Sequence, residues 1–316
     1  MSEVSVTEFD VIFVSYDEDN ADENWADLQN IWPHAKRVHG VYGSDAAHKA
    51  AAEMSDTDRF TTCDADTVIK PEFFDTRIPK EIAEDMTKVI SWSSKNVVNG
   101  LVYGNGSLKC WTKPFVMGMK THEESDQPKN KVEFCFESGY TQSNDILSIT
   151  HPNGSPRQAW RSGFREGVKM SLNEGIKAPL KDFKSQIFWK NMTRLLVWCS
   201  VGADIEHGMW CMYGARMGCF MTMLKDWDYI KVRDFEYLND LWTEEVSPMF
   251  ESYVSPHMCT TSGYCWDNDR LISEVNYVGR RLREDLGLDI AELDENASNF
   301  FRAVFKNPAR VERKSF

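Results

Sequence analysis

The chain has 316 residues, of which 42% are apolar and 27% are charged, and its formal net charge is -13. This length and apolar content allow one large domain or two modest ones, each with its own core. The acidic balance argues against indiscriminate binding to nucleic acid but leaves room for a local basic site. No run of 18 apolar residues is present, so the sequence predicts no membrane span and we expect a cytoplasmic protein.

The eight cysteines are scattered along the chain and form no Cys-x-x-Cys pair. Such spacing, in a chain without a signal peptide pattern, is typical of reduced and mostly buried thiols. We therefore expect neither disulfides nor a cysteine-ligated zinc ion.

The first part of the chain alternates apolar strand-like runs with helix-like segments, and the first run is apolar on both faces, as in a parallel sheet. These elements are predicted over Asp10–Tyr16, Ala21–Trp32, Lys36–Val41, a helix from Gly43, and Phe60–Cys63. A β-α-β-α-β order implies a parallel, right-handed arrangement. The loop at 16–20 and the turn at 64–66 should then open on the same edge of the sheet.

Asp64 and Asp66 follow the third predicted strand directly, in the run Asp64-Ala65-Asp66. Two carboxylates two residues apart suit one Mg²⁺ or Mn²⁺, whose other ligands are water and a diphosphate. The spacing alone is weak, because the chain contains five Asp-x-Asp triplets. Position favours this one, since ligands of open α/β sheets bind at the carboxyl ends of strands.

Further along, extended segments over 89–111 are joined by a hairpin signal at Gly104–Gly106, and another strand is predicted over Val132–Phe136. From Ser155 onward the pattern is mainly helical. We expect two regions, an α/β nucleotide-binding region over 1–150 and a mainly helical region over 151–316 that completes the active site.

Arg157, Arg161, Arg165 and Lys169 recur every fourth residue, which places them in one row on a helix. Such a row is often only a solvated face, but few acids are nearby to pair with it, so we expect anion binding. Farther on, a long apolar stretch over 197–218 has Asp204, Glu206 and His207 as its only acidic or imidazole groups. We expect these groups at a break between two packed helices.

The pattern around the first strand, the Asp64-Ala65-Asp66 turn and the glycine-rich hairpin resembles the GT-A fold of nucleotide-sugar glycosyltransferases, over roughly residues 8–140. More specifically, it resembles GT-A-type glycosyltransferases of tailed bacteriophages, some of which modify hydroxymethylated bases in DNA. The segments that carry this resemblance are Ser15–Trp25, Ala35–Val41, Asn99–Gly104 with Leu108 and Lys109, and Trp160–Glu166. It implies an α/β, Rossmann-type mixed sheet with a mainly helical C-terminal region.

The resemblance also implies roles for particular residues. Asp64 and Asp66 would hold Mn²⁺ or Mg²⁺ against the donor diphosphate. The remaining candidates are Tyr16, Asp17 and Glu18 for the donor base and ribose, Arg161 and Arg165 for a diphosphate or acceptor phosphate, and Asp204, Asp145 and Glu166, in that order, for the catalytic base.

The expected activity is transfer of a sugar of the glucose or arabinose class from a UDP-sugar to a hydroxymethylated pyrimidine in DNA, such as hydroxymethylcytosine. If the chain is encoded by a phage, it would act in the cytoplasm of the infected cell. Two alternatives stay open: the same chemistry on a glycan, lipid or protein acceptor, and a non-catalytic module that binds nucleotide sugars or DNA. Fold alone does not decide between acceptors.

Overall fold

The computed structural model describes residues 2–103, 107–121, 139–252 and 265–305. The described chain falls into two compact units, Met1–Ser155, to which the chain from Val304 is also assigned, and Pro156–Ala303. The predicted hairpin at Gly104–Gly106 and strand over Val132–Phe136 lie outside the described residues.

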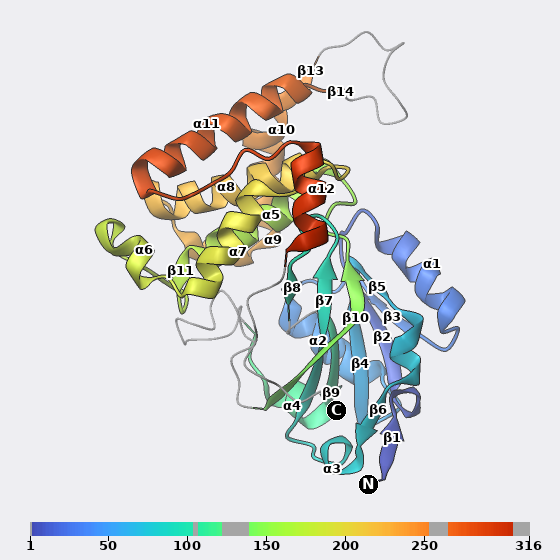
Figure 1. Cartoon of the computed structure of the whole chain (residues 1–316). Helices are drawn as coiled ribbons and strands as arrows, with labels where there is room; N and C mark the ends of the chain where they lie inside the picture. The colour runs from blue at the N-terminus through green and yellow to red at the C-terminus, as the bar shows by residue number, and fades with distance from the viewer. Residues whose placement is uncertain (1, 104–106, 122–138, 253–264, 306–316) are drawn as a thin grey trace. The chain divides into compact units, whose positions relative to one another are not determined.

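The first unit is built on an eight-stranded sheet with the order β3-β2-β4-β9-β7-β10-β5, in which β8 pairs with β7 (Figure 1). Its strands are β2 (Asp10–Ser15), β3 (Lys36–His39), β4 (Arg59–Asp64), β5 (Thr67–Ile69), β7 (Val89–Asn96), β8 (Val102–Tyr103), β9 (Leu108–Thr112) and β10 (Tyr140–Thr150). The pairs β2–β3, β2–β4 and β7–β10 are parallel, whereas β9 runs antiparallel to β4 and β7. A separate small sheet pairs β1 (Glu3–Ser5) with β6 (Arg77–Pro79).

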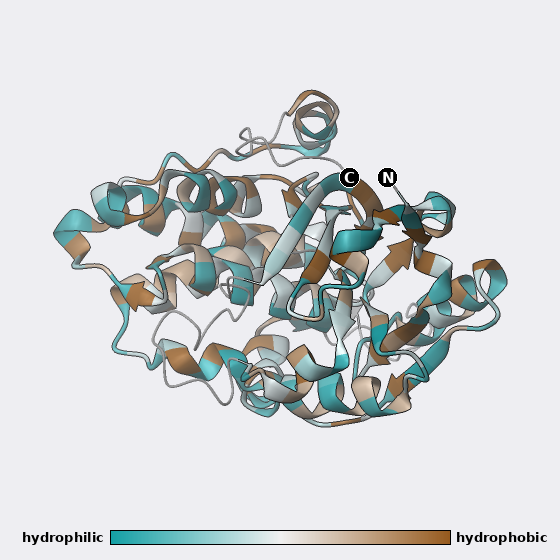
Figure 2. Cartoon of the chain, turned by 90° about the horizontal axis from the view of Figure 1, so that it is seen from below, coloured by the Kyte–Doolittle hydropathy of each residue, from teal (hydrophilic) through white to brown (hydrophobic). Residues whose placement is uncertain are grey.

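Helices cover both faces of this sheet. Successive side chains of β2 point to opposite faces, and because they are apolar, both faces need to be covered. Val11 and Phe13 pack in the core beneath α1 (Ala21–Ile31) and the 3₁₀ helix η2 (Pro71–Asp75). Ile12 points to the other face and packs beneath α2 (Ser44–Met54) and α4 (Lys113–Gly118). The 3₁₀ helix η1 (Val6–Glu8) and the short helix α3 (Lys80–Ala83) also belong to this unit. Figure 2 shows the helices striped with hydrophilic and hydrophobic residues, consistent with one buried face each.

The second unit is mainly helical. Its helices are α5 (Pro156–Met170), α6 (Phe183–Gln186), α7 (Trp189–Ser200), α8 (Gly208–Leu224), α9 (Phe235–Leu241), α10 (Ser247–Phe250), α11 (Asn268–Leu286) and α12 (Glu295–Val304). Two short hairpins are described there, β11 (Leu172–Asn173) with β12 (Ile176–Lys177) and β13 (Glu251–Ser252) with β14 (Cys265–Trp266). The predicted class, a mixed α/β sheet followed by a mainly helical region, is confirmed.

The close approach of α5 and α8 depends on four glycines. Gly163 and Gly167 on α5 and Gly214 and Gly218 on α8 face the partner helix so closely that a Cβ at any of them would lie 2.0–2.3 Å from its backbone oxygens. Real side chains do not tolerate such distances. The two helices can therefore pack backbone to backbone only because these positions lack a side chain.

Five cysteines of the described chain are free and buried: Cys63, Cys110, Cys199, Cys211 and Cys219. The burial predicted for the cysteines is confirmed at those positions. No helix within the described residues is both long and apolar enough to cross a membrane.

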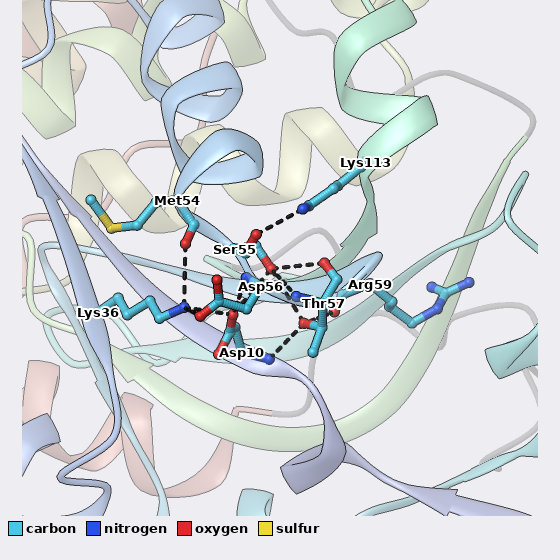
Figure 3. A network of polar contacts seen from close by, with 8 residues as sticks. All are labelled: Asp10, Lys36, Met54, Ser55, Asp56, Thr57, Arg59 and Lys113. Carbon is cyan, nitrogen blue, oxygen red and sulfur yellow. Dashed lines mark hydrogen bonds and ion pairs between the residues drawn. The ribbon is translucent and has the colours of Figure 1, made fainter.

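A polar network ties the start of β2 to β3 and to the loop before β4 (Figure 3). Asp10 Oδ2 accepts hydrogen bonds from Lys36 Nζ at 2.8 Å, the backbone N–H of Asp56 at 2.6 Å and Ser55 Oγ at 3.3 Å. Lys113 Nζ donates to the carbonyl of Ser55 at 2.7 Å, which adds the start of α4 to the network. The network lies at the amino ends of β2, β3 and β4, opposite the edge that carries Asp64.

We expect this network to make stability depend on pH. Burial works to raise the pKa of Asp10, but the hydrogen bonds from Lys36, Asp56 and Ser55 outweigh it and lower that pKa. A lowered folded-state pKa gives stability that is complete above the ordinary value near 4 and is lost as the pH falls toward the folded-state value.

Asp10→Asn should therefore cost about 1 kcal/mol at neutral pH and less below about pH 3. Melting temperatures of both proteins across this pH range measure the effect, with Asp75→Asn at an exposed position as the control. A constant difference between wild type and Asp10→Asn from acid to neutral pH would contradict the assignment.

Candidate active site

Asp64 is the last residue of β4, and Asp66 precedes β5. Both are half-buried, whereas Ala65 between them is buried and its carbonyl accepts a 2.8 Å hydrogen bond from Asn24 Nδ2. This hydrogen bond from α1 holds the turn in place. Two carboxylates remain accessible at the carboxyl end of a buried strand, which is where the sequence predicted them.

The loop after β2 lies at this same edge. Val14 is paired in register with Asp64, so the residues after Ser15 emerge beside the carboxylates. The N–H of His151, just after β10, donates to the carbonyl of Asp66 at 2.6 Å, and Asn20 Nδ2 donates to the carbonyl of His151 at 2.8 Å. The prediction that the 16–20 loop and the Asp64–Asp66 turn share one edge is confirmed.

A group of hydroxyls supports Asp66. Thr67 Oγ1 donates to Asp66 Oδ1 at 3.1 Å. Thr150 Oγ1, at the end of β10, lies 3.5 Å from Thr67 Oγ1, 2.7 Å from Ser94 Oγ and 3.4 Å from Ser107 Oγ. These contacts connect Asp66 to three further strands and limit the motion of its carboxylate.

The thiol of Cys63 lies next to the two carboxylates in the sequence, and their charges affect its pKa. Burial is the main cause that raises the pKa of the Cys63 thiol well above its ordinary value, and the charges of Asp64 and Asp66 add to it. Cys63 is therefore a protonated thiol and an inert part of the core.

His48, on α2, lies edge-on to Trp111 with ring centroids 5.2 Å apart and hydrogen-bonds the carbonyl of Ser44 at 2.7 Å. Burial lowers the pKa of His48, and the charge of Lys109 contributes in the same direction. The bond to Ser44 and the charge of Asp64 oppose this shift. The balance favours a neutral imidazole beside the site.

Lys109 is a site residue for which the sequence analysis predicted no role. It lies opposite Thr62 in the β4–β9 pairing and is only 8% exposed, with its Nζ 6.0 Å from the centroid of Trp111. Residues two apart share a strand face, so Thr62, Asp64 and Lys109 belong to one side of the sheet. A cation with so little access to water needs anions nearby. The signal in the sequence was a lysine inside a short, otherwise uncharged strand.

The predicted donor contacts Tyr16, Asp17 and Glu18 form the start of the loop after β2. The N–H of Tyr16 donates to Glu18 Oε2 at 2.8 Å, so this carboxylate shapes the turn. Asp17 is half-buried. The ring of Tyr16 meets Tyr42 edge-on at 6.0 Å, and Tyr42 is 52% exposed. Tyr42, which the sequence analysis did not select, comes between two glycines of positive φ that shape the turn after β3.

In the second unit, the predicted basic row turns toward α9. The guanidinium carbons of Arg161 and Arg165 lie 4.7 and 4.6 Å from the ring centroid of Phe235. Arg157 and Arg161 both donate to Asn239 Oδ1, at 3.2 and 3.3 Å. Arg161 is buried, so much of its surface is used in packing within the unit.

Two of the predicted catalytic bases also lie in the second unit, and both are ion-paired. Both oxygens of Asp204 accept hydrogen bonds from Arg302, which lower the pKa of Asp204 despite partial burial. Glu166 Oε1 accepts from Lys169 Nζ at 2.5 Å. A lowered pKa and a bound cation weaken a carboxylate as a base. Asp204 lies between the end of α7 and the start of α8, as predicted.

Asp145 lies in the first unit, on the exposed side of β10 where its pairing with β7 is irregular. Ser143 Oγ donates to Asp145 Oδ2 at 2.7 Å. Asp145 precedes Thr150, at the end of the strand, by five residues, which corresponds to roughly 15 Å. The fold therefore does not bring Asp145 to the edge that carries Asp64 and Asp66.

The described residues contain no cluster of three or more His, Cys, Asp or Glu side chains that could hold a metal ion. A closed zinc-type centre is thus absent from the described part of the chain. The pair Asp64 and Asp66 fits a different ion. Mg²⁺ and Mn²⁺ accept one or two carboxylates and take their other ligands from water and substrate phosphates.

No model of a protein family matches the chain, and no curated protein does. Among solved structures, one match is a glycosyltransferase involved in the glycosylation of the major capsid of PBCV-1. It is 12% identical, covers 45% of this chain and 92% of its own, and has a TM-score of 0.28. A likeness this distant carries no argument about activity.

Proposed function

We propose that the chain is a glycosyltransferase that uses Mn²⁺ or Mg²⁺ to move a sugar from a UDP-sugar to a hydroxymethylated pyrimidine in DNA. The observation that carries the proposal is the pair Asp64 and Asp66 at the carboxyl end of β4, beside the loop after β2. A metal-dependent transfer from a nucleoside diphosphate donor uses a metal site with a surface for the base beside it, and two carboxylates next to the loop after β2 support this assignment.

Asp64 and Asp66 would hold the metal, with Thr67 fixing the carboxylate of Asp66. The bound metal supplies Lewis-acid stabilisation of the departing diphosphate. Lys109 adds a fixed positive charge on the same side of the sheet, which favours a polyanionic donor. Tyr16 and Tyr42 form an edge-on aromatic pair, and the exposed ring of Tyr42 is suited to contact the uracil base.

The proposed acceptor is supported by the sequence resemblance to phage enzymes that modify hydroxymethylated DNA. The chemistry requires only that an acceptor hydroxyl loses its proton as the bond to the anomeric carbon forms and the bond to the diphosphate breaks. Because Asp204 and Glu166 are ion-paired and Asp145 lies away from the edge, we assign no catalytic base among them.

The test is mass spectrometry of nucleosides from DNA that contains hydroxymethylcytosine, after incubation with the protein, Mn²⁺ and a panel of UDP-sugars. We expect the modified nucleoside to gain the mass of one sugar. Donor hydrolysis without this gain would overturn the DNA acceptor and leave a glycosyltransferase with a glycan, lipid or protein acceptor. The absence of both transfer and hydrolysis would favour a non-catalytic module.

A further inference from the structure

The second unit carries a concentration of exposed apolar side chains over residues 176–194. Ile176, Leu180, Phe188 and Trp189 are 51–56% exposed. They belong to β12, to the segment before α6 and to the start of α7. This part of the chain is found in Figure 1 by the labels α6 and β11, at the left. Clusters of large exposed apolar side chains are uncommon on a soluble surface and mark interaction sites.

The segment is fixed in place by its inner face. Phe183 and Ile187, one helical turn apart, are buried at 1% and 5% exposure. Lys184 Nζ donates to the carbonyl of Gly287 at 2.6 Å, which anchors α6 to the end of α11. With these contacts on the inside, Phe188 and Trp189 are held outward, with ring centroids 6.0 Å apart.

The same segment is basic although the chain is acidic. Residues 176–194 contain five basic residues and one acid, Asp182, a net charge of +4 in a chain of net charge -13. Lys177, Lys181 and Lys190 form no ion pair with any residue in the described ranges, and Lys190 Nζ lies 5.4 Å from the ring centroid of Trp189. Lys184 has an acidic partner, Asp289 at 3.6 Å.

We propose that residues 176–194 form a docking surface for single-stranded nucleic acid. Proteins that bind single strands combine cations that follow the phosphates with aromatic rings on which bases stack. Phe188 and Trp189 supply the rings, and the exposed side chains of Lys177 and Lys181 supply cations. The surface needs no metal or sugar nucleotide, so the inference agrees with a DNA acceptor but does not rest on the proposed function.

An anionic membrane would also attract aromatic and basic side chains. The charge distribution favours a nucleic acid strand instead. A single strand of nucleic acid contacts only a narrow strip of the protein surface. An anionic membrane is planar and contacts a wider surface, so it would repel the acidic residues, which outnumber the basic ones in the rest of the chain.

The test is fluorescence anisotropy with a labelled oligothymidine, without metal or donor. We expect the wild-type protein to bind the single strand more tightly than a duplex, and Phe188→Ala/Trp189→Ala to bind at least tenfold more weakly. Tyr277→Ala/Phe300→Ala, which removes two exposed aromatic rings from α11 and α12, should bind as the wild type does. Equal binding by the wild-type and Phe188→Ala/Trp189→Ala proteins would overturn the proposal.

A second pair of variants tests the charges independently of the rings. Lys177→Ala/Lys181→Ala should reduce the slope of log affinity against log salt by about 1.4, the value for two lost phosphate contacts on a single strand. Lys225→Ala/Lys231→Ala, at two exposed lysines elsewhere in the unit, should leave the slope unchanged. An unchanged slope in the first pair, or binding to phosphatidylserine vesicles but not to oligothymidine, would overturn the proposal.

Discussion

Gly163→Ala is expected to lower the free energy of unfolding by about 3–5 kcal/mol, a large effect for the addition of a single methyl group. The added Cβ would lie 2.0 Å from the carbonyl oxygen of Cys211, and both atoms belong to rigid helices. Relief requires α5 and α8 to separate along their whole contact, which opens space around Trp160 and Phe164 as well. Equilibrium unfolding in urea, followed by tryptophan fluorescence, measures the change.

Gly118→Ala is the matched control. Gly118 ends α4, and a Cβ there would meet no atom within 4 Å. This substitution should leave stability unchanged or raise it slightly, because alanine restricts the unfolded chain. If Gly163→Ala unfolds at the same urea concentration as Gly118→Ala, the backbone-to-backbone packing of α5 and α8 is wrong.

Asp64→Asn/Asp66→Asn is expected to reduce metal-dependent release of UDP from a UDP-sugar by about 10³-fold or more. Removing both carboxylates removes the site for the ion that stabilises the departing diphosphate, and a loss of about 4 kcal/mol in the transition state corresponds to this factor. Since both residues are half-exposed and amide oxygens can still accept the hydrogen bond from Thr67, the fold should be retained. Initial rates of UDP release with excess Mn²⁺ give the factor.

The control is the exposed triplet that contains Asp226 and Asp228. Asp228 Oδ1 only accepts a hydrogen bond from the N–H of Ile230, in a 3₁₀ turn. Asp226→Asn/Asp228→Asn should therefore keep the wild-type rate. Equal losses of activity in the two double variants would show that negative charge in general, rather than the position at the end of β4, is responsible.

Much of the first unit follows from the sequence because its signals are local. The apolar run at Asp10–Ser15 forms β2, and the run that ends at Asp64 forms β4. The predicted helix from Ala21 ends at Ile31, one residue before its expected end at Trp32. Asn20 is the N-cap residue of α1, but its side chain caps no backbone group of the helix and donates to the carbonyl of His151 instead.

The contacts that were not predicted join residues far apart in the chain. The pairing of Asp204 with Arg302 spans 98 residues, and that of Arg161 with Asn239 spans 78. In neither pair does the separation along the chain follow a helix or strand period, so the sequence does not indicate which residues will meet. The row of arginines was predicted correctly as one helical face, but periodicity does not tell which element packs on that face.

The most direct test of the central claim is a calorimetric titration of UDP into the protein with Mn²⁺ and with a chelator. We predict UDP binding that requires Mn²⁺ in the wild-type protein and is lost in Asp64→Ala/Asp66→Ala, whose melting temperature should stay close to the wild-type value. UDP binding of equal affinity in the presence of the chelator, or in the double variant, would contradict the assignment of this edge as a metal and nucleotide site.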